Sequence, residues 1–146
     1  MSWFEQLRQR LHDAPHPTKA EDRLRAAAVL LLELARSDAE HHPAELAALR
    51  AGLANEFEVP EATLDALLAD ADREARTSVS LFDFVQTLNR AMNQDEKRSL
   101  LGLLWRVAYA DGKIETSEEH LLRRLSNLLH LSHHDFIRAK HVAEQT

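Results

Sequence analysis

The amino-acid sequence predicts an all-α protein, and three observations lead to that class. Only three of its 146 residues are glycine and four are proline, whereas Ala, Leu, Glu and Arg, which favour helices, are abundant. Apolar residues recur every three to four positions, the spacing of one helix face. Typical capping residues precede several of these stretches. We therefore expect one bundle of seven or eight helices built from two related helix-loop-helix units.

The first predicted helix covers Ser2 to His12, and residues 13–17, which contain two prolines, end it. One face of this helix is apolar, with Trp3, Phe4, Leu7 and Leu11 at helical spacing. We expect that face to pack on the protein's own bundle, with a partner helix or a membrane surface as the alternatives. Residues 1–17 are thus predicted to form an amphipathic helix and linker, and residues 18–146 the main helical domain.

Helix-start signals divide the next part of the chain. Thr18 with Glu21 predicts a helix from Thr18 to Ser37. Two prolines mark the first turns of the third and fourth helices, at Pro43 and Pro60. Ser80 precedes the fifth helix, with Asp83 three residues later.

Three more helices follow, each after a pair of residues at capping-box spacing. The pairs are Asn93 with Glu96, Thr116 with Glu119, and Ser132 with Asp135. The helices of residues 18–37 and 94–110 have the widest apolar faces, so we expect them to form the buried centre of the bundle, with Trp105 in its core.

Composition excludes several classes of function. With 18 Lys and Arg against 24 Asp and Glu, the net charge is −6, which disfavours nucleic-acid binding. No cysteine is present, so thiol catalysis and thiolate metal sites are excluded and a cytoplasmic location fits best. We expect no membrane span and no signal peptide, because no apolar run is long enough and the first residues lack a charged-then-apolar pattern. Peripheral membrane association stays open.

The sequence also contains a weak internal repeat. Residues 34–38 align with residues 107–111 at an offset of 73, which also pairs Glu45 with Glu118. After a slip of one residue, 57–60 aligns with 129–132. Two copies of one helical unit predict a bundle with approximate twofold symmetry.

The second copy resembles a known protein family. Residues 110–119 (ADGKIETSEE), followed by a leucine-rich helix and residues 131–136 (LSHHDF), are similar to the signature of the tellurite-resistance TerB family. Residues 37–45 of the first copy are similar but lack the glycine after the aspartate. The resemblance extends from about Arg23 to Lys140. It implies an all-helical bacterial cytoplasmic domain associated with metal or chemical stress, also found fused to DnaJ-like membrane co-chaperones, and it implies no established reaction.

Four acidic residues in the two loops are the candidate site: Asp38, Glu45, Asp111 and Glu118. Their oxygens suit Ca²⁺, Mg²⁺ or Mn²⁺, and the resemblance implies metal binding at these positions. The alternative is structural, in which each Asp accepts loop N–H bonds and each Glu caps a helix. We expect Asp111 and Glu118 to matter more, because Gly112 allows a sharp turn that Ala39 does not. If the acids converge, a cation, Lys113, Arg50 or raised carboxylate pKa values must offset their repulsion.

Other motifs are weaker. The histidines His130, His133 and His134, and the pair His41-His42, are expected to be solvated loop residues rather than transition-metal ligands. No phosphate loop or nucleophile elbow is present. The sequence therefore favours a non-enzymatic module that contacts other proteins in a stress-response or membrane-associated assembly. A small metal-dependent hydrolase using the acidic loops is the alternative, and homodimer formation is left open.

Overall fold

The computed structural model describes residues 19–36, 43–77 and 80–145, and within these ranges every regular element is an α-helix. The seven helices of this described part are α2 (Lys19–Arg36), α3 (Pro43–Glu56), α4 (Glu61–Thr77), α5 (Phe82–Ala91), α6 (Gln94–Ala108), α7 (Thr116–Leu128) and α8 (His133–Glu144). The all-α prediction is confirmed. The predicted helix at residues 2–12 and the loop that contains Asp38 lie outside the described residues.

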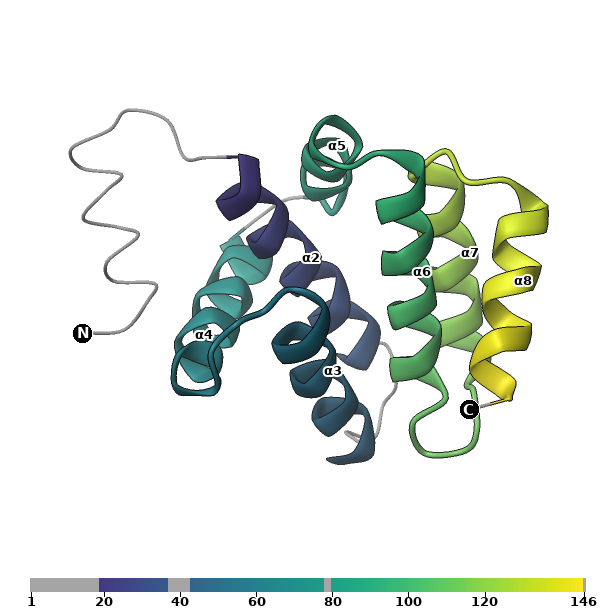
Figure 1. Cartoon of the computed structure of the whole chain (residues 1–146), viewed down its shortest axis with the longest axis horizontal. Helices are drawn as coiled ribbons and strands as arrows, with labels where there is room; N and C mark the ends of the chain where they lie inside the picture. Colours follow the sequence, from purple (N-terminus) through teal and green to yellow (C-terminus); the bar gives the residue numbers. More distant parts are fainter. Residues whose placement is uncertain (1–18, 37–42, 78–79, 146) are drawn as a thin grey trace.

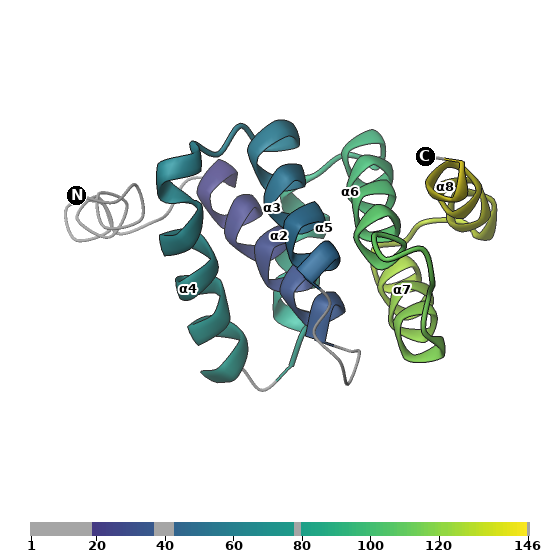
Figure 2. The same cartoon turned by 90° about the horizontal axis from the view of Figure 1, so that it is seen from below.

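Helices α2 and α6 are at the centre of the arrangement, and the other helices pack around them. Helix α2 contacts α3, α4, α5 and α6, and helix α6 also contacts α3, α7 and α8. Along the long axis of the molecule, α4 and α8 lie at opposite ends, with α2 and α6 between them (Figures 1 and 2). Among the described helices, none has the length and apolar character needed to cross a bilayer.

The core lies on the two helices expected to form it. Every residue of α2 from Ala26 to Leu32 is buried, and on α6 Leu104 and Trp105 are completely buried. Trp105 packs edge-on against Phe136 of α8, with ring centroids 5.1 Å apart, which places α8 against α6. The predicted central pair and the core position of Trp105 are confirmed.

Two of the predicted caps are confirmed. The Asn93 side chain accepts a hydrogen bond from the Glu96 N–H at 2.8 Å, and the Ser132 hydroxyl accepts one from the Asp135 N–H at 3.1 Å. In both cases the acidic residue also accepts from the backbone N–H of the cap residue, completing a capping box.

Two other caps are corrected. The cap residue of α7 is Glu115, with Glu118 as its partner, and Thr116 is already the first helical residue. The Ser80 hydroxyl accepts from the Phe82 N–H at 3.0 Å, and Leu81 occupies the cap position of α5. At α7 the pair Glu115 and Glu118 has the same spacing as Thr116 and Glu119, and both helices have their cap one residue away from the predicted position.

Helices α3 and α7 end in turns of the same kind. Glu58 and His130, which the predicted repeat aligns, both have left-handed backbones, with φ of 56° and 61°. The Val59 N–H donates to the Leu53 carbonyl at 3.2 Å, and the Leu131 N–H donates to the Ser126 carbonyl at 3.0 Å. Such bonds close helix C-termini. The first turn contains one residue more, where the alignment needs its one-residue slip.

Candidate functional site

The helix ends that flank the two acidic segments of the sequence lie at one end of the bundle. The last turns of α2 and α6 and the first turns of α3 and α7 are in the lower half of Figure 1, and Figure 2 views the molecule from that side. Glu45 is in the first turn of α3, Asp111 follows α6, and Glu118 is in the first turn of α7. Asp38 is outside the described residues.

Glu45 is a buried acid, with only 1% of its surface exposed. It continues the stripe of α3 that contains Leu49, Gly52 and Leu53, which are also buried. At helical spacing these residues share one face, and at Gly52 this face packs on Leu103 of α6. The carboxylate therefore extends from the core side of α3 and not from its solvent side.

Glu118 is completely buried and stands at the aligned position of α7. Leu122 and Leu125 continue its stripe. One carboxylate oxygen accepts a hydrogen bond from the Glu115 N–H at 3.2 Å, so the proposed capping role is confirmed for this residue. The favourable field of a helix N-terminus, worth up to about 2 kcal/mol, offsets part of the cost of burying its charge.

Asp111 is half-buried and stabilises its own loop. Its Oδ1 accepts a hydrogen bond from the Lys113 N–H at 3.0 Å, the pattern of a turn closed by an aspartate side chain. Gly112 has φ of +86°, so the sharp turn predicted at this glycine is confirmed.

These acids have the right ligand atoms for a cation such as Ca²⁺, but the described residues alone do not form a complete site. Glu45, Asp111 and Glu118 supply carboxylate oxygens of the kind that Ca²⁺, Mg²⁺ and Mn²⁺ bind. Within the described ranges, however, no three Asp, Glu or His side chains are grouped closely enough to hold a metal ion. A complete site would therefore need ligands from outside those ranges, where Asp38 lies, or from backbone carbonyls and water.

Of the two positive charges expected near these acids, Arg50 lies elsewhere. Arg50 forms ion pairs with Asp65 and, at 3.5 Å, with Glu61, both of α4. The hydrogen bond to Asp65 is the main reason that the pKa of Arg50 is raised. Lys113 is exposed. Arg50 thus ties α3 to α4, which corrects its expected role beside the loop acids.

The described histidines are exposed, as predicted, but His133 and His134 begin helix α8 and are not loop residues. His130, His133 and His134 are all exposed, and the His133 ring stacks on Phe136 with centroids 6.3 Å apart. His41 and His42 are outside the described residues.

Sequence reasoning missed two features of burial. Nothing in residue type distinguishes Glu45 and Glu118 from surface acids, although both fall in register with the apolar stripes of their helices. Lys97 is also buried, with 6% of its surface exposed. Its position four and seven residues before the buried Leu101 and Leu104 is the signal that could have identified it.

The fold and site define an all-helical domain with acids buried at the first turns of two aligned helices. Residues 24–141 match the family model described as tellurite resistance protein TerB. The chain belongs to the TerB family.

None of the curated proteins matches the chain. Among solved structures, the crystal structure of a protein of unknown function from Porphyromonas gingivalis W83 is similar, with a TM-score of 0.64 and 21% sequence identity. The similarity covers 86% of this chain and 95% of that one. At this level of identity, the likeness concerns the fold.

Proposed function

We propose that this chain is a cytoplasmic interaction module of the TerB type, without catalytic activity, that binds a divalent cation at its acidic end. The single observation that carries the proposal is the burial of two carboxylates, Glu45 and Glu118, in the first turns of helices that begin at the same end of the molecule.

Burial makes these two charges costly in the absence of compensation. Removing a carboxylate from water costs several kcal/mol unless hydrogen bonds or opposite charge offset it. A divalent cation offsets two such charges at once, and Asp111 in the adjoining loop supplies another oxygen. Asp38 completes the proposed ligand set, and Ca²⁺, Mg²⁺ and Mn²⁺ are the ions whose chemistry suits it.

The biological role that we propose is a stress response. The family name connects relatives with tellurite resistance. If a cation changes the stability of the module, the concentration of that cation in the cell would control which partners the module binds. We propose that those partners are other proteins, in a cytoplasmic or membrane-associated assembly. A hydrolase working from the same acids is the rival hypothesis.

Thermal unfolding tests the cation directly. The full chain is treated with chelator, dialysed, and unfolded with and without Ca²⁺, Mg²⁺ or Mn²⁺. At a hundredfold excess over its dissociation constant, an ion stabilises the native state by about 2.7 kcal/mol, a shift of roughly 5–10 °C for a domain of this size. We expect Glu45→Gln and Glu118→Gln to reduce the shift.

A matched control is Glu61→Gln. Glu61 is also in a first helical turn, that of α4, but its side chain is 77% exposed. It should keep the whole shift. The cation proposal is overturned if no ion stabilises the wild type, or if all four proteins shift equally. Chelator-sensitive turnover of phosphate or ester substrates would favour the hydrolase instead.

A further inference from the structure

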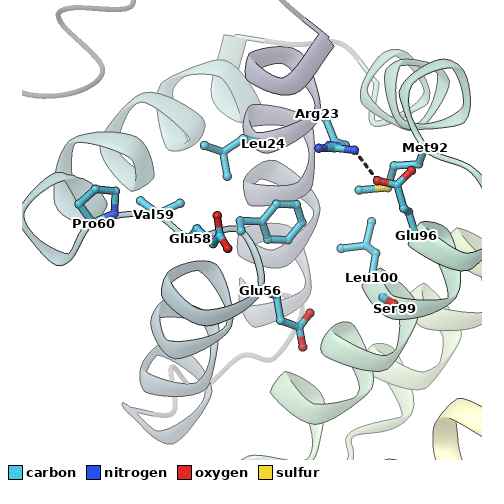
Figure 3. Close-up of a pocket in the computed structure, with 11 residues that line it drawn as sticks. Arg23, Leu24, Glu56, Glu58, Val59, Pro60, Met92, Glu96, Ser99 and Leu100 are labelled. Carbon is cyan, nitrogen blue, oxygen red and sulfur yellow. Dashed lines mark hydrogen bonds and ion pairs between the residues drawn. The ribbon is translucent and has the colours of Figure 1, made fainter.

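A groove separates the turn between α3 and α4 from the first half of α6. Its volume is about 530 Å³, within the range of roughly 300–1,000 Å³ typical of ligand sites. Figure 3 shows Leu24 of α2 at its top, Val59 on one wall, and Met92 and Leu100 on the facing wall. These four side chains form a largely apolar interior, in which the flexible Met92 can adapt to different shapes.

The charged side chains of the groove are mostly acidic. Three carboxylates, Glu56, Glu58 and Glu96, line it together with one guanidinium, Arg23. Arg23 forms an ion pair with Glu96 across the groove (Figure 3), and Glu56 forms one with Arg106 of α6. These two ion pairs join α6 to α2 and to α3. Glu58 takes part in neither of them.

Glu58 is an exposed acid that forms no ion pair or hydrogen bond with any residue in the described ranges. Its backbone is left-handed, with φ of 56°, a conformation that glycine adopts without the penalty of roughly 1–2 kcal/mol that other residues incur. The turn itself is closed by the Val59 N–H and not by the Glu58 side chain. The stability of the fold therefore does not explain why position 58 has a carboxylate side chain.

We propose that this groove binds a lysine or arginine side chain of a partner protein, together with a neighbouring apolar side chain. The cation would pair with Glu58, and its methylene stem and the apolar neighbour would lie against Leu24, Met92 and Leu100. A cationic occupant is complementary in charge to this groove, since Glu56 and Glu96 are paired with arginines and Glu58 is the one carboxylate of the described lining without such a partner. The inference rests on the proposed role in protein contacts but not on the cation.

Short peptides test the groove. The probe is acetyl-Leu-Arg-Leu-amide, and its matched controls replace arginine by glutamine or glutamate. Each is titrated into the isotope-labelled full chain in chelator, so that cation binding plays no part, and amide shifts are followed by NMR. We expect the arginine peptide to shift amides of Val59, Ser99 and Leu100 at millimolar concentration, and Glu58→Gln to weaken this binding about twofold to fivefold.

The control variant is Glu61→Gln, three residues away and outside the groove, and it should bind like the wild type. No shift at about 10 mM peptide would overturn the proposal. Equal binding by the glutamine peptide would assign the groove to an uncharged occupant and also overturn it, as would unchanged binding in Glu58→Gln. If the chain forms a dimer in solution and Ser99→Trp disrupts it, the occupant of the groove is instead a second copy of the chain.

Discussion

Gly52 of α3 lies directly against Leu103 of α6, so closely that a Cβ atom at position 52 would overlap the Leu103 side chain. Leu103 is itself buried and has little room to move. This contact sets the spacing between the helix that contains Glu45 and the central helix. A glycine in a helix is unfavourable by about 1 kcal/mol relative to alanine, so here close packing outweighs helix propensity.

We predict that Gly52→Ala lowers the free energy of unfolding by about 1–3 kcal/mol, because the new methyl group must displace Leu103. Urea unfolding measures the change. Gly102→Ala is the matched control, since a Cβ atom at position 102 would have no other atom within 4 Å. This substitution should stabilise the helix by up to about 1 kcal/mol. In a Leu103→Ala background, Gly52→Ala should cost less. Equal effects at positions 52 and 102 would show that the helices are not in close contact.

The strained turn at Glu58 gives a second prediction. Glu58→Gly should raise the free energy of unfolding by about 0.5–1 kcal/mol, the relief of the left-handed backbone less the extra flexibility of glycine when unfolded. Glu58→Ala keeps the strain and should change stability little. If chemical denaturation ranks the alanine variant equal to or above the glycine variant, the turn is not strained.

The only tyrosine of the chain gives a pH prediction. Burial and then a hydrogen bond from Tyr109 Oη to Glu144, 2.9 Å long, raise the pKa of Tyr109 to about 12. The pKa is about 10 in an unfolded chain. Because the folded pKa is the higher one, the stabilisation is fully present below pH 10 and is lost as the pH rises from about 10 to about 12.

Absorbance of the phenolate measures this titration without interference from other tyrosines. Glu144→Gln should lower the pKa only in part, since burial is the larger cause. A native midpoint near 10 in the wild type would mean that Tyr109 is neither buried nor bonded to Glu144.

The caps of α7 and α8 provide a fourth prediction. Ser132→Ala removes the acceptor of the Asp135 N–H and should cost about 0.5–2 kcal/mol of stability. Thr116→Ala should change stability by less than about 0.5 kcal/mol, because Thr116 follows the cap residue. If Thr116→Ala lowers the free energy of unfolding as much as Ser132→Ala does, Thr116 and not Glu115 is the cap residue of α7.

The sequence predicted what depends on neighbouring residues. Helix class, the caps at Asn93 and Ser132 and the turn at Gly112 all follow from residues within a few positions of one another. The central role of α2 and α6 also follows, because a wide apolar face must be covered by other helices. The cap at Thr116 was wrong by one residue, since Glu115 and Glu118 have the same spacing as Thr116 and Glu119.

Features that depend on distant residues could not be predicted in this way. The ion pairs Arg23–Glu96 and Glu56–Arg106 join residues 73 and 50 positions apart, so the groove between them leaves no local pattern. The burial of Glu118 likewise depends on how α7 packs on α6, which capping and periodicity do not specify. For the acidic loops, the sequence identified the residues but not their surroundings.

Isothermal titration calorimetry of the full, chelator-treated chain is the most direct test of cation binding at the acidic end. We predict saturable heat with Ca²⁺, Mg²⁺ or Mn²⁺, an affinity at least about tenfold weaker in Glu118→Gln, equal to about 1.4 kcal/mol, and an unchanged affinity in Glu61→Gln. Absence of saturable heat with all three ions, or equal affinities in the wild type and Glu118→Gln, would contradict the account.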